Sequence, residues 1–155
     1  MKPFYEILYG RFHELHLELE KALDALPEEA LDWVPVLGMN SASVLITHLT
    51  GAERFLIGDV VMGEPSNRDR DAEFKAHGLS RQDLQGRLAL TDAYIRVAFE
   101  NLSLADLETE RLNPRHGKMV STAWAILHAL EHAGIHLGHI EMTVQLWHQR
   151  TSGPD

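Results

Sequence analysis

Apolar side chains recur with the period of an α-helix in four separate stretches of the chain. In residues 4–26 the apolar positions follow one another in steps of three and four, which is typical of a helix with one buried face. Pro27 ends this first helix. A second helix begins after Asn40 or Ser41, either of which can cap its first turn. One side of it carries Val44, Leu45, His48, Leu49, Ala52, Phe55 and Leu56.

The second half of the chain predicts two further helices. Ser80 is a suitable N-cap with an acidic residue in the turn that follows, and the next apolar positions again have helical spacing. The fourth helix, capped by Ser121 or Thr122, runs to about His148. No stretch alternates between apolar and polar residues for long enough to form a strand. Four long helices predict an all-α fold, in which residues 1–155 form a single four-helix-bundle domain.

The connection between the second and third helices is long and polar. It extends from Gly63 to about Gly78, beyond the usual length of a connection in a compact bundle. Such a crossover allows the two helices to run parallel or to lie apart, and a mobile lid is the alternative. We interpret its charges as those of a solvated surface loop. A second polar loop, with breakers at residues 113–117, precedes the fourth helix.

Charge and composition narrow the classes of function. The formal net charge is −9 and the 14 lysines and arginines form no cluster in the sequence, which argues against a nucleic-acid partner. The chain has no cysteine, so any thiol chemistry needs a thiol that arrives as a substrate. The N-terminus lacks an apolar run of signal-peptide length, and no 18-residue apolar stretch occurs. We therefore expect a cytoplasmic protein with no membrane partner.

Four histidines lie on one face of the last predicted helix. His128, His132, His136 and His139 follow one another at offsets of four, four and three, which places neighbouring side chains about 6 Å apart. One interpretation is a polar seam in which the imidazoles bond one another, backbone carbonyls or water. The other is a metal site, because two histidines one helical turn apart can bind a single ion.

A metal site would need a ligand from another helix. His48 is the natural candidate because it is the histidine on the apolar side of the second helix, and bundles build their sites from facing helices. Three protein ligands leave at least one position open, as in catalytic metal sites. The spacing alone leaves the polar seam and the metal site both open.

Other polar and aromatic residues receive plainer interpretations. Isolated histidines on the first helix, His13 and His16, are expected at the surface or its boundary. Three carboxylates near the histidines in sequence are candidates to hold an imidazole by its other nitrogen; they are Glu53, Glu131 and Glu141. Trp124 and Trp147 are expected to be core or interface anchors.

Two motifs resemble those of the DinB/YfiT-like superfamily, and together they cover about a quarter of the chain. The first, in the region of the second helix, is Trp33-x-Pro35, then Asn40-Ser41, then His48-Leu49-x2-Ala52-Glu53-Arg54-Phe55. The second, in the last helix, is Trp124-x2-Leu127-His128-x2-Glu131-His132-x3-His136-x-Gly138-His139-Ile140-Glu141. The resemblance implies a four-helix bundle with a long connection between helices 2 and 3, often assembled as a homodimer.

The resemblance also implies one bound divalent transition metal. Carried over residue by residue, its ligands fall on His48, His132 and His136, with His128 and His139 as neighbours on the same face. A shift by one turn, to His128 and His132, also fits the sequence. Zinc or nickel are the first expectations for the ion, followed by iron or manganese.

Known activities of the resembled superfamily imply a function. They include the transfer of low-molecular-weight thiols, such as mycothiol or bacillithiol, to electrophiles, and a thiol-dependent maleylpyruvate isomerase. We therefore expect a small-molecule substrate and a metal-dependent thiol transferase, or a hydrolase that activates water at the same ion. The alternative is a non-catalytic stress-response or ligand-binding bundle whose metal is structural or absent.

Overall fold

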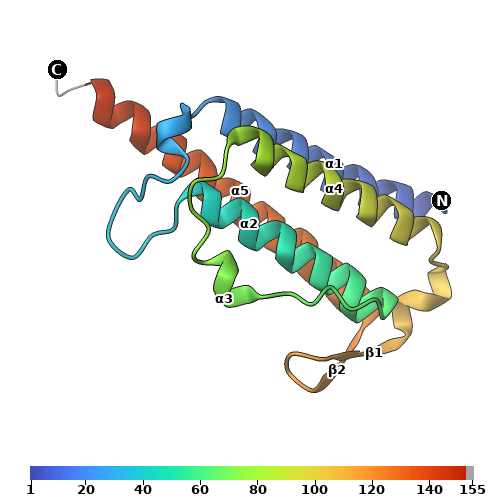
Figure 1. Ribbon diagram of the computed structural model, residues 1–155. Coiled ribbons are helices and arrows are strands. Elements are labelled where there is room, and N and C mark those ends of the chain that lie inside the picture. Colours follow the sequence, from blue (N-terminus) through green and yellow to red (C-terminus); the bar gives the residue numbers. More distant parts are fainter. Residues whose placement is uncertain (153–155) are drawn as a thin grey trace.

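The computed structural model describes residues 1–152, and four long helices dominate it (Figure 1). They are α1 (Pro3–Asp24), α2 (Ala42–Glu53), α4 (Arg81–Glu100) and α5 (Thr122–Ser152). The predicted all-α class is therefore confirmed; residues 153–155 of the predicted domain lie outside the described part. Within residues 1–152 no helix has both the length and the apolar character needed to cross a membrane. The shorter elements are η1 (Glu28–Ala30), η2 (Arg54–Met62), α3 (Arg70–Glu73), η3 (Leu104–Glu108), β1 (Glu110–Asn113) and β2 (Lys118–Ser121).

Serine side chains start three of the long helices, as the sequence predicts. The Ser41 hydroxyl accepts a hydrogen bond from the backbone N–H of Val44 at 3.3 Å. Ser80 forms a reciprocal capping box with Asp83. The Ser121 hydroxyl accepts from the backbone N–H three residues later, at 3.1 Å. Each cap satisfies a backbone donor that the first turn leaves without a helical partner.

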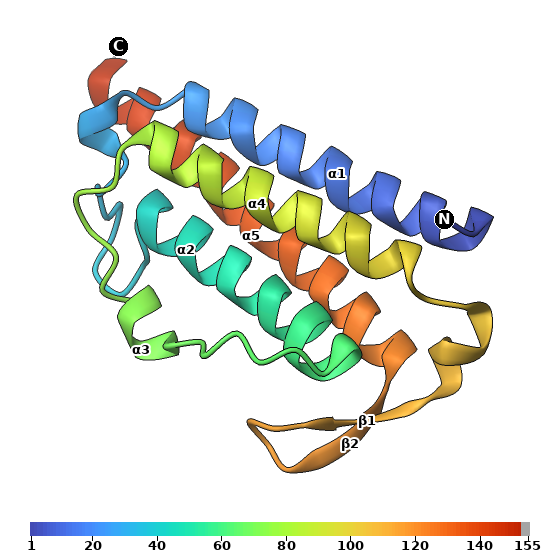
Figure 2. The ribbon, with the colours of Figure 1, turned by 45° about the vertical axis from the view of Figure 1, so that its right-hand side comes forward.

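The long connection after α2 makes α2 and α4 run in the same direction. Helix α1 packs against α4 and α5, and α2 also packs against α4 and α5. Figures 1 and 2 show the chain returning from the far end of η2 along the outside of α2, through α3, to the start of α4. Because α3 packs on α2, this segment is part of the folded wall of the bundle.

Two elements differ from the sequence prediction. The second helix does not remain an α-helix beyond Glu53: it changes at Arg54 into a π-helix, η2, which ends at Met62 and is followed by Gly63 with a φ of +70°. The predicted polar loop before α5 contains an antiparallel hairpin, in which Glu110 pairs with Ser121 and Asn113 with Lys118. Its strands have four residues each, too few for a period of two to be recognised.

The core consists of two apolar clusters with polar residues between them on every long helix. On α1, His16 lies between Phe12 of one cluster and Leu19 of the other. The same change from one cluster to the other occurs around Glu53 on α2, around Asp92 on α4 and around His132 on α5. We call these residues the polar layer: His16, His48, Glu53, Asp92, His132 and His136.

One part of the polar layer is a buried ion pair. His16 is 3% exposed and Glu53 is fully buried, and the Nε2 atom of His16 lies 2.9 Å from a Glu53 carboxylate oxygen. The other ring nitrogen lies 3.5 Å from Asp92, which also accepts a hydrogen bond from the Tyr9 hydroxyl. The expectation that His16 lies at the surface or its boundary is therefore wrong, whereas the His13 side chain is half-exposed.

This pair predicts a pH dependence of stability. Burial opposes the charged imidazole, but Glu53 and Asp92 outweigh burial and raise the pKa of His16 to about 9. Relative to an unfolded pKa of about 6.5, this contributes about 3 kcal/mol below pH 6.5, and the contribution is lost as the pH rises through 9. We expect the free energy of unfolding to fall across this range in urea titrations, and this fall to be absent in His16→Gln.

His77→Gln is the matched control, because the His77 side chain is 82% exposed. It should retain the decline in stability of the unmodified protein. An unchanged decline in His16→Gln would show that His16 does not carry the effect.

Candidate metal centre

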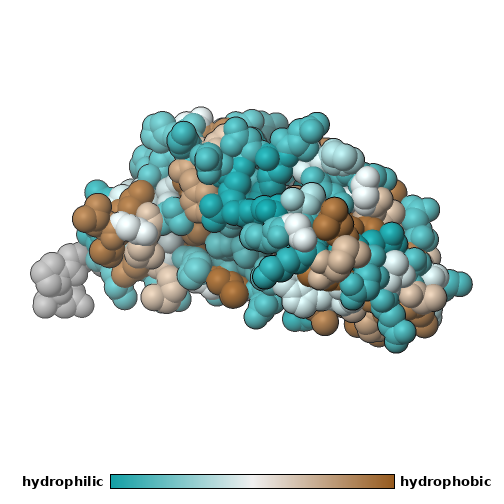
Figure 3. Space-filling view, turned by 90° about the horizontal axis from the view of Figure 1, so that it is seen from below, coloured by the Kyte–Doolittle hydropathy of each residue, from teal (hydrophilic) through white to brown (hydrophobic). Residues whose placement is uncertain are grey.

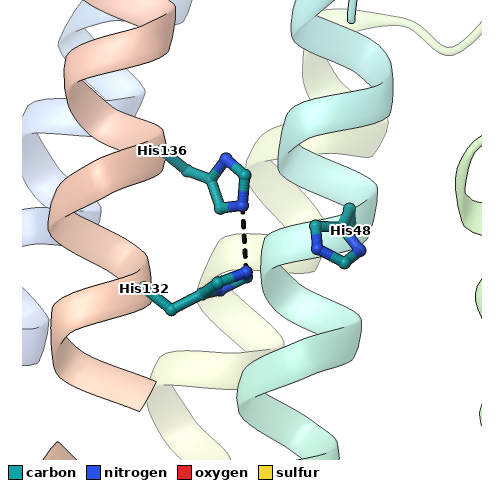
Figure 4. A group of neighbouring side chains, drawn as sticks. All are labelled: His48, His132 and His136. Carbon is teal, nitrogen blue, oxygen red and sulfur yellow. Dashed lines mark hydrogen bonds between the residues drawn. The ribbon is translucent and has the colours of Figure 1, made fainter. Parts of the chain in front are cut away.

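Three imidazoles converge between α2 and α5. His48 projects from α2, while His132 and His136 project from successive turns of α5 (Figure 4). One ring nitrogen of each residue lies within 4.8 Å of the other two, and the Nε2 atoms of His132 and His136 are 3.0 Å apart. The spacing of four on α5 and the packing of α2 on α5 together form a group that could hold a metal ion.

A carboxylate fixes the orientation of the His48 ring. His48 is 7% exposed, and its Nδ1 atom lies 3.0 Å from a carboxylate oxygen of Glu73. The ionised Glu73 can only accept, so this contact assigns the proton of His48 to Nδ1; the Arg68 guanidinium lies farther from the same nitrogen, at 3.3 Å. This tautomer leaves the lone pair on Nε2 free, which is the arrangement that carboxylates impose on metal-binding histidines.

Glu73 reaches His48 because the returning chain lies close against α2. Helix α3 starts with an Asp69 cap, and Arg68 donates two hydrogen bonds to the Glu73 carboxylate, one of them at 2.7 Å. A Cβ atom at Gly51 would collide with that carboxylate. Burial opposes ionisation of Glu73, but the hydrogen bonds from Arg68 and His48 lower its pKa below the usual value.

The two histidines on α5 are held neutral. Burial and the neighbouring histidines lower the pKa of His132 to about 3 and that of His136 to about 4. Their Nδ1 atoms are buried and have no hydrogen-bond partner among the residues that the structure describes. Buried polar atoms without partners call for an explanation, and neutral imidazoles with free lone pairs are the form that binds metals.

The neighbouring histidines and carboxylates lie outside this group. His128 stacks on Trp124 with ring centroids 4.8 Å apart, and its Nδ1 atom is 3.6 Å from Glu131. The ring centroid of His139 is 5.6 Å from that of His136, but its side chain is exposed. Glu53 does hold an imidazole, but that of His16. Trp124 is 46% exposed, so it is not a core anchor.

Sequence reasoning missed Glu73 and Arg68. Both lie in the connection whose charges predict a solvated loop, yet Glu73 is 7% exposed. No spacing within the connection marks either residue, because their partner His48 lies on another element. Gly51 is the one local signal, since a glycine on the wall of a helix permits another group to approach closely.

Two cavities flank the Arg68–Glu73 pair. A cavity of about 180 Å³ opens beside His48 and His132. A larger one, of about 470 Å³, is lined by Glu73 and by residues of α2, α3 and α4, but by none of the three histidines. The smaller cavity is therefore the one that gives a ligand access to the histidine group.

Comparison with models of known protein families identifies the family of this chain. The family model described as the DinB superfamily matches residues 11–140, most of the chain. The chain belongs to the DinB superfamily. The three grouped histidines lie at the positions where the DinB/YfiT-like resemblance placed the metal ligands. No curated protein sequence matches this DinB superfamily chain.

Solved structures share the fold of this DinB superfamily protein. A conserved protein from Enterococcus faecalis has a TM-score of 0.79 at 15% identity, covering 94% of this chain and 97% of that one. A DinB-like protein from Bacillus subtilis has a TM-score of 0.69 at 15% identity, covering 96% and 93%. A mycothiol-dependent maleylpyruvate isomerase has a TM-score of 0.66 at 18% identity, covering 88% of this chain but 62% of that one. At these identities the likeness shows the fold alone.

The neutral state of the α5 histidines can be measured directly. In metal-free protein at pH 5.5, we expect His132 and His136 to remain uncharged, because their pKa values lie at about 3 and about 4. Nitrogen NMR of the imidazole rings reports the charge state of each residue. In the urea-unfolded chain the same two rings should titrate near the reference value of about 6.5. Folded-state midpoints equal to the unfolded ones would contradict the assignment.

Proposed function

We propose that this DinB superfamily protein binds one divalent transition metal through His48, His132 and His136, and transfers a small thiol to an electrophilic substrate. The observation that carries the proposal is the convergence of three imidazole nitrogens from two helices within 4.8 Å. Zinc and nickel are the expected ions, then iron and manganese, because imidazole binds several divalent metals and geometry and availability decide among them.

The donor set fits such an ion. Two of the three rings have lowered pKa values, so their lone pairs are available at neutral pH without displacing a proton. The third ring is oriented by Glu73. Three protein ligands also leave room for a substrate atom, whereas structural zinc sites use four.

The thiol in this proposal comes from outside the chain. A bound divalent ion lowers the pKa of a coordinated thiol and so supplies a thiolate near neutral pH. The protein has no cysteine of its own. A structural neighbour is a mycothiol-dependent enzyme, which supports a small thiol as the substrate class. The chain's own residues hold and orient the imidazoles, and the apolar Ala52, Phe55 and Leu56 line the approach to them.

Two other functions would use the same histidines. A hydrolase would take water in place of the thiol, and a binding protein would hold the metal without catalysis. The homodimer implied by the resemblance stays a prediction. Measuring the metal content of the purified protein tests whether it binds an ion. Measuring thiol transfer with and without a chelator tests whether that ion takes part in the reaction.

Metal content should depend on residues from both helices. We expect tag-free protein to contain about one equivalent of metal by elemental analysis, and His48→Ala and His136→Ala to retain less than about a tenth of it, because each loses one of three ligands. Glu73→Gln should bind metal about 10–100-fold more weakly, since it loses the charged partner of His48.

His139→Ala is the control for the metal measurement, because His139 lies on the same helix but outside the group. It should retain the full metal content. Full retention in His48→Ala would exclude a site shared by α2 and α5.

Thiol transfer should require the metal. We expect the protein to accelerate conjugation of at least one low-molecular-weight thiol, among cysteine, mycothiol and bacillithiol, to a fluorogenic bimane electrophile. A chelator should abolish this rate, and His48→Ala should lack it, because an uncoordinated thiol stays mostly protonated at neutral pH. Acceleration that survives both treatments would argue against metal-dependent transfer, and no acceleration with any thiol would favour the binding protein.

A further inference from the structure

The cavity beside the histidine group has walls from four parts of the chain. His48 and His132 lie at one side of it, and the other walls come from α2 with η2, from the returning segment, from the hairpin loop and from the start of α5. Its volume of about 180 Å³ is below the range of about 300–1,000 Å³ that is usual for drug-sized ligands. The cavity therefore suits a small molecule. Its lining residues are His48, Ala52, Phe55, Leu56, Arg68, Arg70, Asn113, Arg115, His116, Trp124, His128 and His132.

The charged residues of this lining are all cationic. It contains three arginines and no carboxylate, although the chain has 23 acidic residues and only 14 lysines and arginines. Figure 3 views the face on which α3 and the hairpin lie and shows hydrophilic residues gathered across its middle. A positive cavity on an acidic protein attracts small anions and repels cations.

Two of these arginines have no carboxylate partner. Arg68 is paired with Glu73, but within residues 1–152 Arg70 and Arg115 form no ion pair, in contrast to six of the ten arginines. Both also line an adjoining cavity with Phe55 and Pro114, so they share one rim. Unpaired guanidinium groups at a cavity rim are suited to bind a carboxylate or a phosphate in a bidentate manner.

Contacts within the chain position the Arg70 side chain and the Arg115 backbone. The Arg70 guanidinium lies over the Phe74 ring, 4.5 Å from its centroid. The Asn113 side chain is buried and accepts a hydrogen bond from the backbone N–H of Arg115 at 3.1 Å. The turn closes when Gly117, at a φ of +62°, donates its backbone N–H to the carbonyl of Asn113.

An exposed aromatic side chain also lines this cavity. Trp124 is 46% exposed and is held nearly parallel to the His128 ring, at an interplanar angle of 19°. This arrangement offers a flat apolar surface to a planar molecule. The cavity thus combines a cationic rim, a flat aromatic wall and the histidine group.

We infer that this cavity binds a small organic anion, which places its carboxylate or phosphate group against Arg70 and Arg115 and its unsaturated or aromatic body against Trp124. The inference rests on the proposed function only in treating this anion as the substrate that reacts beside the histidines. The anion itself would bind whether or not a metal is present, because neither arginine belongs to the histidine group.

The experiment uses benzoate and phenyl phosphate as probes, with benzamide as the uncharged analogue of benzoate. Binding is followed by the indole N–H signals of the three tryptophans in NMR titrations of the full-length protein. We expect the anions to shift the Trp124 signal in a saturable manner and to leave the signals of Trp33 and Trp147 unchanged, since those rings pack on each other. The anion that binds more tightly identifies the preferred group.

Removing the positive charge of Arg70 or Arg115 should weaken binding of the anionic probes. We expect Arg70→Gln and Arg115→Gln each to raise the dissociation constant roughly tenfold, because each loses a charge-assisted hydrogen bond. Arg87→Gln is the matched control: it removes an arginine that likewise forms no ion pair within residues 1–152 and that does not line this cavity. Arg87→Gln should bind the two anions with the same dissociation constants as the unmodified protein. Equal binding in the Arg70→Gln/Arg115→Gln double variant, or equal binding of benzamide and benzoate, would overturn the inference.

A second arm repeats the titration after treatment with a chelator. Binding that persists without metal and depends on the arginines supports the anion site, whatever the outcome of the metal analysis. If binding disappears when the metal is removed, the anion binds to the metal ion itself, and the proposed role of the arginines is wrong. If the anions do not bind but the protein still binds metal, this inference is wrong and the proposed metal-dependent function is unaffected.

Discussion

A buried ion pair between His16 and Glu53 joins α1 to α2 through the middle of the bundle and constrains their relative position. Burying a charge costs several kcal/mol unless a partner compensates it, and leaving one partner alone costs about 3–5 kcal/mol. Sliding α1 along α2 by one turn would separate the two charges and leave the fully buried Glu53 without its partner. The pair therefore fixes the axial position of α2, which is also the helix that carries His48.

Two faces of α2 carry opposite electrostatic arrangements. Toward α1 and α4, a cationic imidazole is compensated by carboxylates. Toward α5, the imidazoles of His132 and His136 face no carboxylate and are neutral, while Glu73 contacts only the far nitrogen of His48. This separation keeps the lone pairs of the histidine group free, because a carboxylate close to the α5 rings would favour their protonation.

Local patterns predicted much of this architecture, and non-local contacts account for what they missed. The helices and their serine caps follow from period and from residues a few positions apart. The grouping of His132 and His136 follows from one helical turn, and His48 follows from its position on the apolar side of the second helix; the family resemblance points to the same three residues. In contrast, the burial of His16 depends on Glu53, which lies 37 residues away, and Glu73 is positioned by a chain segment with no periodic pattern. The π-helix after Glu53 has the same residue types as an α-helix, so its wider turns are not visible in the sequence.

The hairpin loop has a consequence for how such a bundle diversifies. Residues 114–117 are exposed, belong to neither apolar cluster and still supply Arg115 and His116 to the cavity wall. Substitutions there change the chemistry facing a ligand while the helices and the histidine group keep their support, since exposed loop positions contribute little to stability. Selectivity can thus change at the exposed positions 114–116, separately from the demands of folding and reactivity on the rigid scaffold.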